Sequence, residues 1–108
     1  MELEDLPIES EYDKDFMNLL EKEPEVKKLV TTGDLCLRTV TKPMMEKNYD
    51  SLVSCLQYAN NASYFHDEAI RKTSQEDIKM YCINRMRLTE EIKALIMPHL
   101  LRGPGASL

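Results

Sequence analysis

Glycine is almost absent from this chain of 108 residues, since Gly33 is the only one before Gly103 and Gly105. No Asn-Gly or Asp-Gly pair is present to form the tight turns of β-hairpins. The scarcity therefore favours long helices over strands. The length corresponds to a single domain. We predict an all-α fold, an antiparallel bundle of three long helices with a short N-terminal helix.

Residues 1–9 are acidic, and we predict a flexible lead-in there, or one that docks through its apolar residues Leu3, Leu6 and Ile8. The helical bundle domain is predicted over 10–100 and a flexible tail over 101–108. Ser10 stands before Glu-Tyr-Asp, a typical helix start with early carboxylates. Apolar residues at helical spacing follow, so the short first helix is predicted to run from Ser10 to near Pro24.

The second helix is predicted to begin at Pro24, a favoured first helical residue. Its apolar positions alternate steps of four and three, which is the seam of a helix packed along its length. These positions are Val26, Val30, Gly33, Leu37, Val40 and Met44. Gly33 would break the helix if Asp34 caps a new one, and Pro43 would kink it or open the next turn. The sequence leaves both breaks open.

A third helix is predicted from about Asp50 to Lys72, with mostly small residues on one face. They are Leu52, Cys55, Leu56, Ala59, Ala62, Ser63, His66, Ala69 and Ile70. Small side chains let helix axes approach closely, so this should be the central helix. The last helix should be capped by Thr73 or Ser74 and should stop at Pro98.

The apolar residues of the last helix occupy more than one face. One broad stripe comprises Ile78, Tyr81, Cys82, Leu88, Ile92, Leu95 and Ile96. Ile83, Met86 and Met97 lie to one side of it, with Met80 and Ala94 close by. Either neighbouring helices cover this second set, or it forms a partly exposed strip that receives a partner's helix. Flexible methionines suit the second interpretation.

Two polar residues fall on the apolar faces. Arg85 lies in the middle of the stripe. Either its aliphatic part packs on the apolar surface while its guanidinium reaches water, or its guanidinium pairs with a carboxylate of a bound peptide. His66 is predicted to be a hydrogen-bonded core histidine rather than a ligand or a base. The predicted partner-binding residues are Ile83, Met86, Met97, Arg85 and Met80.

Composition and missing motifs argue against several functions. The net charge of −5 offers no basic excess for direct nucleic-acid binding. Three cysteines without Cys-x-x-Cys spacing indicate neither a disulfide framework nor a zinc site. No signal peptide or membrane-spanning run is recognisable, so we expect a cytoplasmic or nuclear protein. Phosphate-loop and hydrolase motifs are missing, and we predict no enzyme, no catalytic residue, no metal and no cofactor.

The segment from Met45 to Ile96 resembles the second and third helices of the MIT domain, a three-helix bundle of trafficking proteins. The likeness rests on Lys47-Asn48-Tyr49, on the small residues Ala59, Ala62 and Ala69, and on "MRLTEEIK" in the last helix. Arg85 and Leu88 depart from the family pattern, which has an aromatic residue and an arginine there. The resemblance implies binding of C-terminal helices or strands of ESCRT-III subunits.

These observations predict a non-catalytic protein–protein interaction module, an adaptor or small complex subunit that binds a helix or short peptide of another protein. The alternative is a structural homo-oligomer, in which the second strip is buried against a copy of itself.

Overall fold

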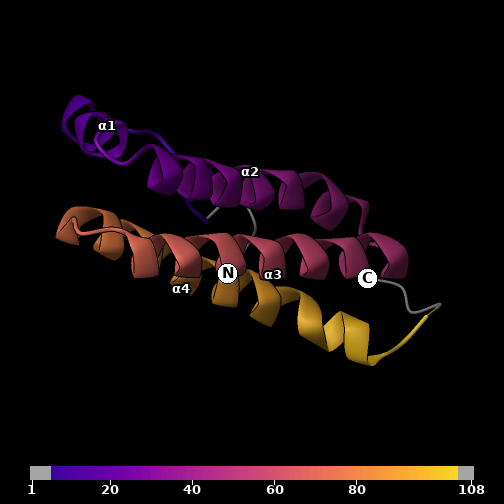
Figure 1. The fold of residues 1–108 in the computed structure, drawn as a ribbon. Helices are drawn as coiled ribbons and strands as arrows, with labels where there is room; N and C mark the ends of the chain where they lie inside the picture. The colour runs from indigo at the N-terminus through magenta and orange to yellow at the C-terminus, as the bar shows by residue number, and fades with distance from the viewer. Residues whose placement is uncertain (1–5, 105–108) are drawn as a thin grey trace.

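The structure is a computed structural model that describes residues 6–104. It contains four helices and, over that range, no strand: α1 (Lys14–Glu21), α2 (Pro24–Glu46), α3 (Tyr49–Lys72) and α4 (Glu76–Leu101). The three long helices run antiparallel, and α3 lies between α2 and α4 (Figure 1). The predicted all-α bundle with a short N-terminal helix is confirmed.

The central helix α3 is held close to its neighbours by small residues. Ala59, Ala62 and Ala69 are fully buried, as the sequence predicted. Asn48 begins α3 with a capping box, in which its side chain accepts from the Ser51 amide and the Ser51 hydroxyl accepts from the Asn48 amide. Lys47 turns the chain out of α2 with a φ of 57°. The α2–α3 connection is therefore short and locally specified.

Neither Gly33 nor Pro43 breaks α2, which is continuous to Glu46. A Cβ on Gly33 would lie 2.7 Å from His66 Nε2, so the glycine lets α2 and α3 approach at this level. The predicted stop at Pro98 is wrong, because α4 continues to Leu101. Proline removes one backbone donor, and the carbonyl it leaves free belongs to the exposed residue Ala94, where water can satisfy it. Residue 101 therefore belongs to the helix and not to a tail.

Two predicted caps are also wrong. α1 begins at Lys14, with the Asp13 side chain accepting from the Phe16 amide, so Ser10 is not its cap. The N-cap of α4 is Gln75. Thr73 still organises this corner, because its hydroxyl accepts from the Gln75 amide and donates to Glu23. The α1 cap thus lies three residues beyond the predicted one, whereas Gln75 makes no side-chain capping bond in α4.

Residues 6–13, which we name the N-terminal strap, precede α1 without helical structure. Leu6 and Ile8 are buried, so this part of the lead-in docks through its apolar residues, in agreement with the second prediction for it. Leu3 lies outside the described residues. Leu6 and Ile8 join a core cluster with residues of α2, α3 and α4. The strap therefore lies against both α2 and α4 and completes the core.

The core consists of two hydrophobic clusters along the bundle axis. One, near α1, contains Leu20, Val26, Val30, Ala69, Ile78 and Cys82. The other, toward the α2–α3 connection, contains Leu6, Ile8, Leu37, Val40, Leu52, Cys55, Ala62, Leu88, Ile92 and Ile96. In each long helix the boundary between the clusters is marked by a buried polar residue: Asp34 in α2, His66 in α3 and Arg85 in α4. A polar layer thus divides the core.

Candidate functional site

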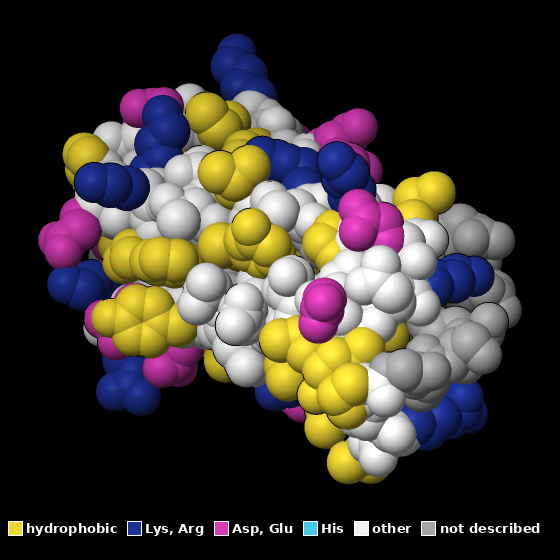
Figure 2. Space-filling view, turned by 90° about the vertical axis from the view of Figure 1, so that its right-hand side faces the viewer, with side chains coloured by type: hydrophobic (Ala, Val, Ile, Leu, Met, Phe, Trp, Pro, Cys, Tyr) yellow, Lys and Arg dark blue, Asp and Glu magenta, His cyan; other side chains and the backbone are white. Residues whose placement is uncertain are grey.

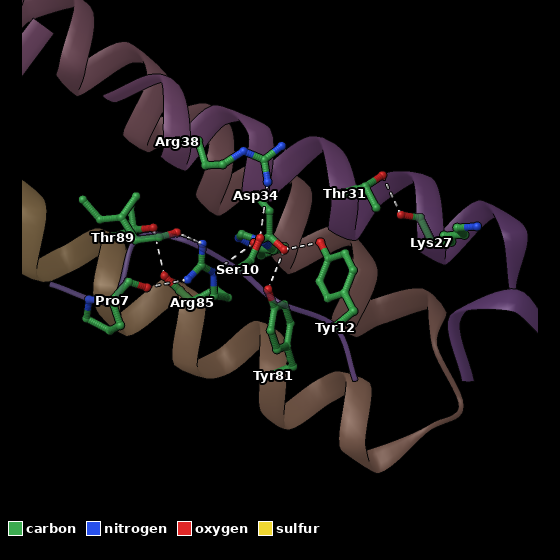
Figure 3. A network of polar contacts seen from close by, with 12 residues as sticks. Pro7, Ser10, Tyr12, Lys27, Thr31, Asp34, Arg38, Tyr81, Arg85 and Thr89 are labelled. Carbon is green, nitrogen blue, oxygen red and sulfur yellow. Dashed lines mark hydrogen bonds and ion pairs between the residues drawn. The ribbon is translucent and has the colours of Figure 1, made fainter. Parts of the chain in front are cut away.

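Asp34 is the centre of the polar layer and is fully buried. Its Oδ1 atom lies 2.9 Å from Arg85 Nε and 3.0 Å from His66 Nε2. Its Oδ2 atom accepts hydrogen bonds of 2.5 Å from the hydroxyls of Tyr12 and Tyr81. Figure 3 shows Tyr12 from the strap and Tyr81 and Arg85 from α4 converging on the carboxylate. One side chain therefore ties the strap and the three long helices together.

Arg85 is buried, with 7% of its surface exposed, and all of its hydrogen bonds are internal. Besides Asp34, it donates from Nη1 to the Pro7 carbonyl at 2.9 Å and from Nη2 to the Ile8 carbonyl at 2.7 Å. Its prediction as a partner-binding residue is therefore wrong, because the guanidinium is enclosed by the strap and paired with Asp34. Neither sequence interpretation, a head in water or a head on a bound peptide, anticipated an internal carboxylate.

The charges of the layer reinforce one another. Burial opposes the charged form of Asp34, but hydrogen bonds from His66, Tyr12 and Tyr81 and the charge of Arg85 outweigh it and lower its pKa to about 2. Burial, and then the hydrogen bond to Asp34, raise the pKa of both tyrosines. Asp34 is thus a charged, saturated acceptor. A carboxylate with four donors and no exposed surface is suited to hold the fold rather than to take a proton from a substrate.

His66 confirms the prediction of a hydrogen-bonded core histidine. It is fully buried and its Nε2 faces Asp34, whereas its Nδ1 has no hydrogen-bond partner among the described residues. The sequence did contain a signal for this layer, since Asp34 stands on the seam between Val30 and Leu37 and Arg85 on the opposing stripe. Opposite charges on two buried seams favour pairing across the core.

The remaining predicted partner-binding residues separate into two groups. Ile83, Met86 and Met97 are half-buried on one flank of α4, and neither core cluster includes them. We call these three residues the α4 strip. Met80 is half-exposed and faces the other way, lining a groove between α1 and α4. The structure therefore brings three of the five residues together and assigns Met80 to a different surface.

Apolar side chains are also exposed at the end of the bundle where α2 meets α3 and α4 ends. Figure 2 looks onto this end and shows hydrophobic side chains gathered between charged ones. Met45, at the end of α2, is 67% exposed, and Leu101, the last residue of α4, is 79% exposed. Leu101 follows Met97 by one helical turn, so the α4 strip continues toward this end.

The thiols have the character of core residues. Burial raises the pKa of Cys55 and of Cys82 to about 12, and burial also raises the pKa of Cys36. A raised pKa disfavours the reactive thiolate. Within residues 6–104, no group of three or more His, Cys, Asp or Glu side chains is placed to hold a metal ion. Over the same range, no helix combines the length and the apolar character that crossing a membrane requires.

Comparison of the chain with protein-family models, with curated proteins and with solved structures finds no match. The resemblance to the MIT domain therefore stays a prediction.

Proposed function

We propose that this protein is a non-catalytic interaction module that binds a helix of a partner protein along the α4 strip. The observation that carries the proposal is the position of Ile83, Met86 and Met97, which are half-buried on one flank of α4 and outside both core clusters. Side chains of this kind are adaptable and apolar, and they gain free energy when a partner covers them.

The spacing of the α4 strip suits a helical partner. Ile83 and Met97 are separated by two heptads, and Met86 stands three residues after Ile83. Such positions form one seam for helix–helix packing. At 1.5 Å per residue the seam is about 21 Å long, or about four helical turns. Glu90 and Lys93, which form an ion pair, interrupt it with charge and would set the register of the partner.

The polar layer supports a structural rather than a catalytic use of the buried charges, because their hydrogen bonds join the strap to the bundle. The resemblance to the MIT domain supports the same class of function, with an ESCRT-III-type C-terminal helix as the corresponding ligand. An adaptor or small complex subunit of the cytoplasm or the nucleus fits this proposal. The second candidate is a homo-oligomer, since a copy of α4 offers an equally apolar seam.

The experiment is selection of a displayed library of short amphipathic helices, followed by measurement of the selected peptides against variants. We expect Met86→Asp to weaken binding at least tenfold, because the charge would lose its water when the partner docks. Leu35→Asp makes the same chemical change at a 55% exposed position of α2 and should leave binding unchanged.

Met97→Asp provides a second variant near the end of α4 if Met86→Asp perturbs folding. Unchanged binding in folded Met86→Asp and Met97→Asp proteins would contradict the proposal. Light scattering distinguishes the second candidate, because a dimer that dissociates in Met86→Asp would show that the strip binds its own copy.

A further inference from the structure

A groove of about 490 Å³ lies between α1 and the first turns of α4, on the side of α4 away from the strip. Both elements are found at the same end of the bundle (Figure 1). Its apolar lining consists of Phe16 and Leu19 from α1 and Met80 and Tyr81 from α4. These side chains are half-buried or exposed, so the groove offers apolar surface that the fold itself does not cover.

The floor of the groove is held in place from beneath. The rings of Phe16 and Tyr81 pack with their centroids 4.8 Å apart. The Tyr81 hydroxyl is in turn fixed by its 2.5 Å hydrogen bond to Asp34 in the polar layer (Figure 3). Met80, next to this pair, is 50% exposed and flexible. A rigid aromatic floor beside an adaptable methionine is preorganised to receive an apolar side chain.

The rim of the groove is uniformly acidic. Its charged lining residues are Glu11, Asp13, Asp15 and Asp77. The first turns of α1 and α4 explain part of this acidic character. Asp15 and Asp77 interact favourably with the positive ends of the helix dipoles, and Asp13 caps α1. Local helix chemistry does not explain why two acidic helix starts face one apolar groove. That convergence comes from the tertiary packing of α1 on α4.

Some surface carboxylates are neutralised by ion pairs, and within the described part of the chain the four at the rim are not. Among residues 6–104, no lysine or arginine forms an ion pair with any of them. By contrast, Glu25 pairs with Lys72 at 2.9 Å and Asp67 pairs with Arg71 at 2.9 Å. No ion pair in the described part of the fold therefore neutralises the rim, and its four carboxylates contribute to the overall charge of −5.

We propose that this groove is a second docking site, which takes a lysine- or arginine-rich amphipathic segment of a partner protein. An apolar residue of that segment would occupy the floor formed by Phe16, Tyr81 and Met80. Its flanking cations would pair with the rim, whose four carboxylates have no ion-pair partner among residues 6–104. The same charge repels nucleic acids and anionic membranes. The inference rests on the proposed interaction function and names the chemistry of a partner at a separate face of α4.

The test uses two synthetic helical peptides with identical leucine positions. All remaining positions are lysine in one peptide and glutamate in the other. We expect the wild type to bind the lysine peptide, with an affinity that falls as salt is added, and not to bind the glutamate peptide. Asp15→Asn/Asp77→Asn should weaken binding of the lysine peptide about fivefold. Met80→Ser should also weaken binding of the lysine peptide, because it removes apolar surface from the floor of the groove. Amide chemical shifts should change in α1 and in the first turns of α4.

A matched control removes the same charge elsewhere. Glu46→Gln/Glu91→Gln neutralises two exposed carboxylates outside the groove and should leave the affinity within about twofold of the wild type. No binding by the wild type, or equal losses in the two double variants, would overturn the inference. If only Met86→Asp loses binding of the lysine peptide, the peptide binds at the α4 strip. That result would contradict the docking site in the groove and support the proposed function. Failure of both this peptide and the displayed library would contradict both.

Discussion

The Asp34 carboxylate and the carboxylates of the α1–α4 groove occupy opposite environments. Asp34 is fully buried and receives four hydrogen bonds, from Tyr12, His66, Tyr81 and Arg85. The rim carboxylates of the groove are on the surface, and no described cation pairs with them. The two regions nevertheless adjoin, because the Tyr81 ring lines the groove while its hydroxyl binds Asp34.

This contrast shows that the same chemical group has different roles according to its solvation. A buried carboxylate must be paired, and its partners then become part of the fold. A hydrated carboxylate needs no partner, so its charge remains available to another molecule. Substitutions in the polar layer should therefore affect stability, whereas substitutions in the groove should affect association.

The largest effect is expected for Asp34→Ala. The change leaves the buried Arg85 guanidinium without its anion and removes an acceptor from three other donors, which should cost about 3–5 kcal/mol. Urea denaturation measures the loss. Asp67→Ala removes one partner of the exposed pair with Arg71 and should cost less than about 1 kcal/mol. Equal losses in the two variants would show that the polar layer contributes no more than a surface pair.

Arg85→Met should destabilise the fold somewhat less, by about 2–3 kcal/mol, because Asp34 keeps its other three donors. The distinguishing result is local. Without the bonds to the Pro7 and Ile8 carbonyls, the amides of the strap should exchange with solvent faster than those of α3, as hydrogen exchange can measure. Lys93→Met removes a cation from the surface of the same helix and should leave the strap protected. Unchanged exchange in Arg85→Met would mean that Leu6 and Ile8 hold the strap by themselves.

The pH dependence of stability should carry the signature of Asp34. Its pKa is lowered from 3.8 to about 2 in the folded protein, so the stabilisation is complete above the ordinary value and is lost as the pH falls toward 2. The shift corresponds to about 2 kcal/mol. In Asp34→Asn, stability should decline less steeply over this range than in the wild type, whereas Asp67→Asn should follow the wild type. Parallel declines in wild type and Asp34→Asn would contradict the assignment.

The smallest effect on stability is expected in the groove. Asp15→Asn/Asp77→Asn removes two carboxylates from the first turns of helices and should cost less than about 1 kcal/mol, a difference that added salt should reduce. Thermal unfolding measures it. A loss as large as that of Arg85→Met would place these groups with the polar layer and remove the contrast between the two regions.

Much of the fold could be predicted because it depends on periodicity. The α2 seam of Val26, Val30, Leu37 and Val40 is buried as predicted, and so is the small face of α3. Caps were less predictable, since Ser10 and Asp13 are both suitable residues and the packing of the strap decides between them. Pro98 was a reasonable place to predict the end of α4. The helix accommodates this proline because the carbonyl that it leaves free belongs to the exposed residue Ala94, and a single sequence does not show that exposure.

The candidate site divides in the same way. Helical spacing grouped Ile83, Met86 and Met97 correctly on one flank of α4, because three residues on one helix have fixed relative positions. Spacing could not separate Met80 from them, since that depends on where α1 packs. Nor could it place Arg85, whose partners belong to other elements.

The sequence by itself determined the helices, their inward faces and the core position of His66, because these follow from residues a few places apart. Only the tertiary structure decided which charges meet. Asp34 and Arg85 are 51 residues apart, and Arg85 reaches carbonyls 77 and 78 residues before it in the strap. The acidic groove likewise exists only where α1 packs against α4. Pairing of this kind depends on the desolvation of specific groups in the assembled fold, and no local pattern of residues encodes it.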